Sequence, residues 1–141
     1  IQDILKLTNL AENYSVSELV DSCLAKNNKK TINILNENNY SLEDCILIIR
    51  TFLIKSKRLL SLSYQVKEKN NLDGVISSFK PPIFWKDKEI IKRQLQNWPY
   101  ENVKNLIFDI NKTEYLIKTN SVNSINILSN FIIEQTRVVN N

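Results

Sequence analysis

Histidine is absent from this chain of 141 residues, and its absence removes several kinds of chemistry. Ser-His-Asp and Cys-His nucleophiles, histidine acid–base catalysis and histidine-containing metal sites are all excluded. Glycine occurs once, at Gly74. A single glycine excludes both the phosphate-binding loop G-x-x-x-x-G-K-[ST] and the dinucleotide-binding pattern G-x-G-x-x-G.

Turn-forming residues are scarce as well. Only three prolines accompany the one glycine, whereas a sheet of many strands needs both residue types in its turns. The chain is 43% hydrophobic and 24% charged, as expected of a soluble folded domain. Its length and composition therefore predict an all-α chain of one domain, or of a small domain with part of another, with enough residues to bury a core.

Cysteine is also rare, and the two thiols do not form a metal-binding pattern. Cys23 and Cys45 lie among aliphatic residues with helical spacing, where a free cysteine usually packs as a small hydrophobic side chain. The adjacent acids Glu43 and Asp44 stand where a helix is expected to begin, so helix capping explains them. We therefore expect no cofactor, no metal site and no catalytic activity.

The charge balance is mildly basic. The chain has 19 Lys and Arg side chains and 15 Asp and Glu side chains, which gives a net charge of +4. A net positive charge permits nucleic acid or an acidic protein as a partner. No stretch approaches the roughly 20 apolar residues of a membrane span, and no secretory signal is recognisable. We expect a cytoplasmic protein without a membrane partner and, because the first residue is Ile1, a fragment of a longer chain.

Hydrophobic periodicity predicts a bundle of six to seven helices. Apolar residues recur at helical spacing, and Ser, Asn or Pro stands at most of the expected helix ends. The expected helices cover residues 15–26, 29–38, 42–69, 72–78, 84–98, 99–118 and 121–137. Within the sixth, Glu114 and Lys118 have the i, i+4 spacing of a stabilising ion pair.

The third expected helix is the most apolar. Residues 45–54 read CILIIRTFLI, which leaves almost no polar side to the helix. Such a helix is either central in its own bundle or covered by another subunit. The residues that we assign to a subunit interface on this basis are Ile46, Ile49, Phe52 and Leu53.

A proline–aromatic break separates this helix from the rest of the chain. Pro81 and Pro82 cannot lie inside a helix, and we expect Phe84, Trp85 and Trp98 to pack around them. The helix that follows carries four cations, which are Lys86, Lys88, Lys92 and Arg93. They are candidates for contact with DNA or a protein partner, although a solvated basic face is the simpler interpretation.

The order of these segments resembles the C-terminal part of the delta subunit of the bacterial DNA polymerase III clamp loader. Four segments carry the resemblance: SVSELVDSCLAKNNKKTINILNENN at 15–39, ILIIRTFLIKSKRLLSL at 46–62, KPPIFWKDKEIIKRQLQNWP at 80–99 and TEYLIKTN at 113–120. They span nearly the whole chain in one order, and KPPIFWKDK is the most specific of them.

The resemblance implies a non-catalytic role in DNA replication. Residues 1–28 would end the small lid domain of an AAA+-like subunit, and residues 29–141 would form its collar domain. Collar domains join the loader subunits, so the implied partners are the tau/gamma and delta-prime types of subunit. The sliding clamp would be reached only through an N-terminal domain that lies outside this sequence, and primed DNA is a further implied partner. Polymerase catalysis belongs to another subunit of the holoenzyme.

Two other functions remain open on the residues alone. The basic helix also suits a free-standing helical nucleic-acid-binding module, and the bundle suits an unrelated helical adaptor.

Overall fold

The computed structural model describes residues 15–137, and every regular element in that range is a helix. A first helix covers residues 15–24. It is followed by α2 (Asn28–Glu37), α3 (Leu42–Lys69), α4 (Leu72–Ser78), the 3₁₀ turn η1 (Trp85–Asp87), α5 (Lys88–Asn97), α6 (Tyr100–Thr119), the 3₁₀ turn η2 (Ser121–Asn123) and α7 (Ser124–Thr136). The all-α expectation is confirmed. The beginning of the predicted lid segment, residues 1–14, lies outside the described residues.

Helix α3 is the longest described element, and local sequence sets both of its ends. Ser41 Oγ accepts a hydrogen bond from the backbone N–H of Asp44, and the Asp44 carboxylate accepts one from the N–H of Ser41. This reciprocal capping box satisfies two N–H groups at the helix start. At the other end Asn70 adopts a left-handed conformation with φ of 50°, which asparagine tolerates better than most residues.

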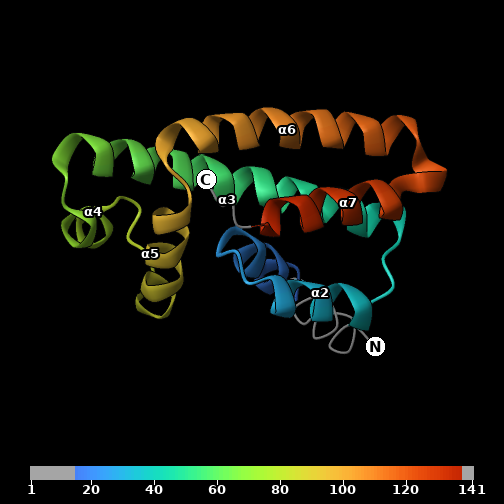
Figure 1. Cartoon of the computed structure of the whole chain (residues 1–141), viewed down its shortest axis with the longest axis horizontal. Coiled ribbons are helices and arrows are strands. Elements are labelled where there is room, and N and C mark those ends of the chain that lie inside the picture. Colours follow the sequence, from blue (N-terminus) through green and yellow to red (C-terminus); the bar gives the residue numbers. More distant parts are fainter. Residues whose placement is uncertain (1–14, 138–141) are drawn as a thin grey trace.

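Helices α3 and α6 lie side by side along the length of the molecule (Figure 1). Tyr64 of α3 packs on Tyr100 of α6, and Arg50 lies near Glu114, so the two helices are antiparallel. Helix α7 packs against both of them, while α4 and α5 pack against the C-terminal half of α3. The expected Glu114–Lys118 ion pair is present at 2.9 Å on α6.

Two apolar clusters make up the core. The larger joins the helix of residues 15–24 to α3, α6 and α7, and its fully buried members include Leu19, Phe52 and Ile110. The smaller lies beneath α4, the proline break and α5, and consists of Leu62, Val75, Ile76, Phe79, Ile83 and Ile91. The helix of residues 15–24 therefore shares its core with the helices that follow it.

The proline break is present, but its aromatic packing differs from the prediction. Phe79 and Ile83 enter the smaller cluster, whereas Phe84 is 57% exposed and Trp85 is 69% exposed. The prediction that Phe84 and Trp85 pack around the prolines is wrong. Ile83 takes the inward position and directs its two neighbours outward. Trp98 is buried, but in the larger cluster.

The helix starts after the break also differ. Residues 85–87 form a 3₁₀ turn before α5 begins at Lys88. Ser121 makes no side-chain capping bond, and α7 begins three residues later, at Ser124. Both differences move a helix boundary by a few residues and leave the order of elements unchanged.

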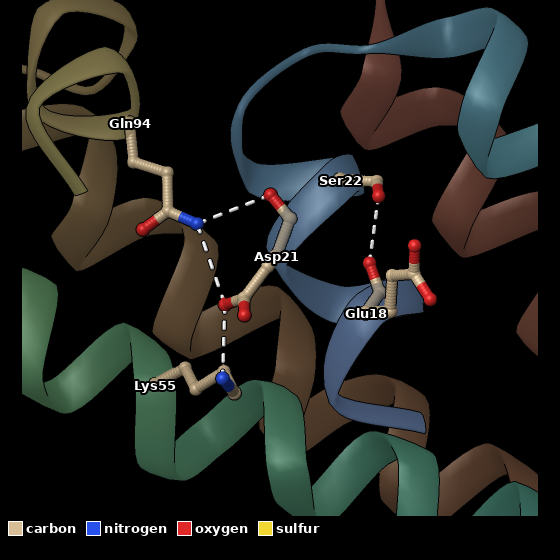
Figure 2. Close-up of polar contacts among 5 residues, drawn as sticks. All are labelled: Glu18, Asp21, Ser22, Lys55 and Gln94. Atoms are coloured by element: carbon tan, nitrogen blue, oxygen red, sulfur yellow. Dashed lines mark hydrogen bonds and ion pairs between the residues drawn. The ribbon is translucent and has the colours of Figure 1, made fainter. Parts of the chain in front are cut away.

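A buried polar node holds three helices together (Figure 2). The Asp21 carboxylate lies 2.9 Å from Nζ of Lys55 on α3. Gln94 Nε2, on α5, donates to the backbone carbonyl of Asp21 at 3.1 Å and approaches its carboxylate at 3.5 Å. Only 18% of each charged side chain is exposed. Asp21 therefore fixes the helix of residues 15–24 against α3 and α5.

Replacing Asp21 with alanine should lower the free energy of unfolding by about 2 kcal/mol, because Lys55 would then be largely buried without a partner. Urea titration measures the change. The matched control is the double variant Asp21→Ala/Lys55→Met, which removes the orphaned charge. It should be more stable than Asp21→Ala alone, and the reverse order would show that the ion pair does not stabilise the node.

Candidate functional site

The four predicted contact cations are not equivalent. Lys86, Lys92 and Arg93 line one hollow of about 440 Å³ on the surface of α5, and Lys88 does not border it. Lys92 Nζ lies 3.2 Å from the Asp73 carboxylate of α4. Glu89 also borders the hollow. The structure therefore brings three of the four cations together, one of them partly neutralised.

Exposed aromatic rings adjoin these cations. The Phe84 and Trp85 rings lie 5.9 Å apart between centroids, in a tilted arrangement. Lys86 Nζ lies 5.5 Å from the Trp85 ring centroid. Unpaired nucleic-acid bases stack on exposed aromatic rings while their phosphates contact nearby cations. The segment 84–93 thus has the chemistry of a single-strand contact surface, which we call the basic aromatic patch.

Sequence reasoning assigned a structural role to Phe84 and Trp85, and so missed them as surface residues. A signal was present, because Ile83, Phe84 and Trp85 are three consecutive large apolar residues directly after the Pro81–Pro82 break. Three such neighbours cannot all point to one side of an extended chain. At least one of them had to face outward.

The predicted subunit-interface residues are covered by the chain itself. Ile49 and Phe52 have no exposed surface, and Ile46 and Leu53 are partly buried against the larger cluster. The assignment of Ile49 and Phe52 to a subunit interface is therefore wrong. The helix of residues 15–24, α6 and α7 surround this part of α3 and bury its apolar sides. The strongly exposed apolar residue of the segment is Ile54, at 69%.

Both cysteines are buried, as predicted. Burial raises the pKa of the Cys23 thiol to about 12, even though Lys26 is close enough to favour the thiolate. The Cys23 thiol points at the backbone carbonyl of Ile132, 3.4 Å away. Burial also raises the pKa of the Cys45 thiol. Neither thiol has the thiolate character of a nucleophile or a redox centre.

The two thiols should react slowly with Ellman's reagent at about pH 8 in the native state and rapidly in guanidinium chloride. The pKa of the Cys23 thiol is higher in the folded state than in the unfolded state, so the protonated thiol contributes to the stability of the fold. This contribution is complete below about pH 9 and is lost as the pH rises to about 12. The free energy of unfolding should therefore fall across that interval, and less steeply in Cys23→Ala. Rapid native-state labelling would contradict this burial.

Residues 15–137 contain no group of three or more His, Cys, Asp or Glu side chains placed to hold a metal ion. None of their helices is both long and apolar enough to cross a bilayer. Comparison of the chain with protein-family models, curated proteins and solved structures gives no match.

Proposed function

We propose that this chain is the collar region of a clamp-loader delta subunit, which acts in the cytoplasm in DNA replication. The observation that carries the proposal is the order of the helices. A 28-residue apolar helix is followed by a proline break, a short basic helix, a 20-residue helix and a closing helix. This is the order in which the sequence resembles the delta family.

The role is one of assembly, and it requires no catalytic residue. The proposed partners are the tau/gamma and delta-prime types of subunit, with the sliding clamp reached only through an N-terminal domain. The division into a lid end at residues 1–28 and a collar at residues 29–141 remains a prediction. The strongly exposed apolar side chains on α3 and α6, described below, favour an assembly role, because such side chains commonly mark interaction surfaces.

Co-elution with partner subunits tests the assembly role. The chain is mixed with tau/gamma and delta-prime subunits from the same source and passed through a sizing column. We expect the chain to elute at the volume of a larger complex, whereas an unrelated helical protein of similar size should keep its own elution volume. If the chain elutes alone at micromolar concentrations of every subunit, the proposed function is contradicted.

A second candidate function is contact with single-stranded DNA at the basic aromatic patch. The observation that favours it is the position of the exposed Trp85 ring beside Lys86, next to the hollow lined by Lys92 and Arg93. Stacking on an aromatic ring needs an unpaired base, so the patch should prefer single-stranded to duplex DNA. Within a loader it would contact template DNA, and in a free-standing module it would act alone.

Fluorescence anisotropy with a labelled oligothymidine strand tests this contact. Trp85→Ala should weaken binding by about tenfold, since stacking contributes about 1–3 kcal/mol per base. Lys86→Ala/Arg93→Ala should weaken binding and reduce its salt dependence. The matched controls are Tyr115→Ala, an exposed aromatic on α6, and Lys29→Ala, an exposed cation on α2.

The outcomes separate the two functions. DNA binding that Trp85→Ala abolishes, without any assembly, would favour the free-standing nucleic-acid module. Assembly without DNA binding would leave the collar role intact and remove the DNA contact. A loss in Lys29→Ala as large as that in Lys86→Ala/Arg93→Ala would show that binding is a property of the overall positive charge.

A further inference from the structure

The outer face of α6 carries a regular stripe of large apolar and cationic side chains. Lys104, Phe108, Lys112 and Tyr115 are all exposed and follow one another at intervals of four, four and three residues. That spacing places them on one side of the helix. Phe108 is 70% exposed and Tyr115 is 67% exposed. We call these four residues the α6 stripe.

The opposite side of α6 is fully occupied by the protein's own core. Val103, Leu106, Ile110 and Ile117 are buried there against α3 and α7. Nothing in the packing of the described chain therefore requires aromatic residues on the outer side. Two large exposed rings on one helix face, each flanked by lysine, are typical of a surface that a partner covers.

The neighbouring helix extends this surface. The contacts Arg50–Glu114 and Tyr64–Tyr100 fix the antiparallel register of α3 and α6. In that register Ile54 lies at the level of residues 108–112. Ile54 is 69% exposed, and Lys57, one turn further along α3, is exposed as well. The α6 stripe thus lies at the same height along the molecule as a second exposed apolar and cationic region, on α3.

Positive charge predominates along the stripe. Lys104 lies 3.2 Å from the Glu101 carboxylate, and Lys118 shares Glu114 with Arg50. Among the described residues, Lys112 and Lys57 have no carboxylate partner within ion-pair distance. Asp109, which follows Phe108, is exposed and has no ion-pair partner among the described residues. Cations are nevertheless in excess on this side of α6 and α3, where Lys104, Lys112, Lys118, Arg50 and Lys57 outnumber Glu101, Asp109 and Glu114. A partner would be favoured by acidic side chains.

The spacing of the rings suits a helix as the partner. Phe108 and Tyr115 are seven residues apart, so they stand about 10.5 Å apart along the axis, two helical turns. A helix lying along α6 presents its own apolar residues at the same seven-residue repeat. A second copy of this chain fits poorly. An antiparallel pairing of Phe108 with Tyr115 would place Lys112 opposite Asn111, and so within one residue of Lys112 of the other copy.

We infer that the α6 stripe is a docking surface for an acidic amphipathic helix of another protein. The rings of Phe108 and Tyr115 would insert between apolar residues of that helix. Lys112 and Lys57, which have no ion-pair partner among the described residues, would pair with carboxylates at its edges. The inference does not require the clamp-loader role, although a neighbouring loader subunit could supply such a helix.

A designed peptide tests the charge and the anchors together. The probe is a fluorescein-labelled helix of about 21 residues, or three heptads, with Leu at positions a and d and Glu at e and g. The matched control peptide carries Lys at e and g. Anisotropy is measured below the concentration at which either peptide associates with itself. We expect the acidic peptide to bind at least about tenfold more tightly than the basic one.

Surface variants then locate the site without disturbing the core. Phe108→Ser/Tyr115→Ser should weaken binding of the acidic peptide by about tenfold or more. Lys112→Glu should weaken binding of the acidic peptide and strengthen binding of the basic peptide. Val122→Ser, in η2 and 93% exposed, lies outside both proposed surfaces and is the control, which should change the affinity for neither peptide. Circular dichroism verifies that each variant remains helical.

Three results would overturn the inference. They are equal affinity for the two peptides, binding that survives Phe108→Ser/Tyr115→Ser, and no binding of the acidic peptide at about 100 μM. A fourth contradicting result could come from light scattering. A dimer of this chain that dissociates in the Phe108→Ser variant would assign the α6 stripe to a second copy of the chain. If only the collar role is wrong, the chain will still bind the acidic peptide but will not co-elute with loader subunits.

Discussion

Replacing Trp98 with alanine is expected to lower the free energy of unfolding by about 3–5 kcal/mol, the range for loss of a large buried aromatic side chain. Trp98 is 6% exposed and belongs to the larger core cluster. Its indole Nε1–H donates to the backbone carbonyl of Leu24 at 2.8 Å. Lys26 Nζ lies 4.0 Å from the ring centroid. The substitution therefore removes a buried ring, a hydrogen bond and a cation–π contact together.

The indole also joins parts of the chain that are far apart in sequence. Lys26 adopts a left-handed conformation with φ of 60°, and its ammonium donates to the backbone carbonyl of Gln135 on α7 at 2.7 Å. Loss of Trp98 should thus loosen the end of the helix of residues 15–24 and its link to α7. Hydrogen exchange should rise first at residues 21–26.

Guanidinium unfolding followed by circular dichroism measures the loss in Trp98→Ala. Trp98→Phe is the matched control, because it keeps a buried aromatic ring while removing the N–H donor and part of the indole volume. It should cost about 1–2 kcal/mol. If both variants were as stable as the parent chain, the placement of Trp98 in the core would be contradicted.

Phe52→Ala should lower the free energy of unfolding by a similar amount, about 3–5 kcal/mol. Phe52 has no exposed surface, and its ring meets that of Phe131 edge-on, with 5.4 Å between centroids. Its truncation leaves a cavity where α3 meets α7, and the surrounding helices can relax only in part. The loss should be present in the isolated chain, without any partner.

Two controls decide whether Phe52 belongs to the core or to an interface. Phe52→Leu retains most of the volume and should recover much of the stability, while Ile54→Ala, on the exposed side of α3, should cost less than about 0.5 kcal/mol. A normal urea midpoint for Phe52→Ala, combined with loss of assembly, would restore the interface interpretation of Phe52.

Helix boundaries set by local chemistry could be predicted from the sequence. The expected range of α3, 42–69, coincides with the observed helix, because Ser41 caps its start and Asn70 supplies the left-handed residue after its end. The Pro81–Pro82 break was predictable for the same reason, since proline excludes the helix interior wherever it occurs. Each of these features depends on a few neighbouring residues.

The direction of individual side chains was harder to predict, because it depends on contacts distant in sequence. Phe52 is buried because α7 places Phe131 beside it, and no local pattern reports that contact. The polar node joins Asp21 to Gln94, 73 residues later. The sequence therefore predicted the basic helix of the candidate site but placed the exposed rings of Phe84 and Trp85 inside.

The most direct test of the proposed function is the native mass of a reconstituted mixture. The chain is combined with tau/gamma and delta-prime subunits and analysed by native mass spectrometry. The collar role predicts a complex that contains this chain together with both subunit types, and a Phe108→Ser/Tyr115→Ser variant shows whether the α6 stripe contributes to it. A spectrum that contains the loader subunits in complex and this chain only as a free species would contradict the proposal.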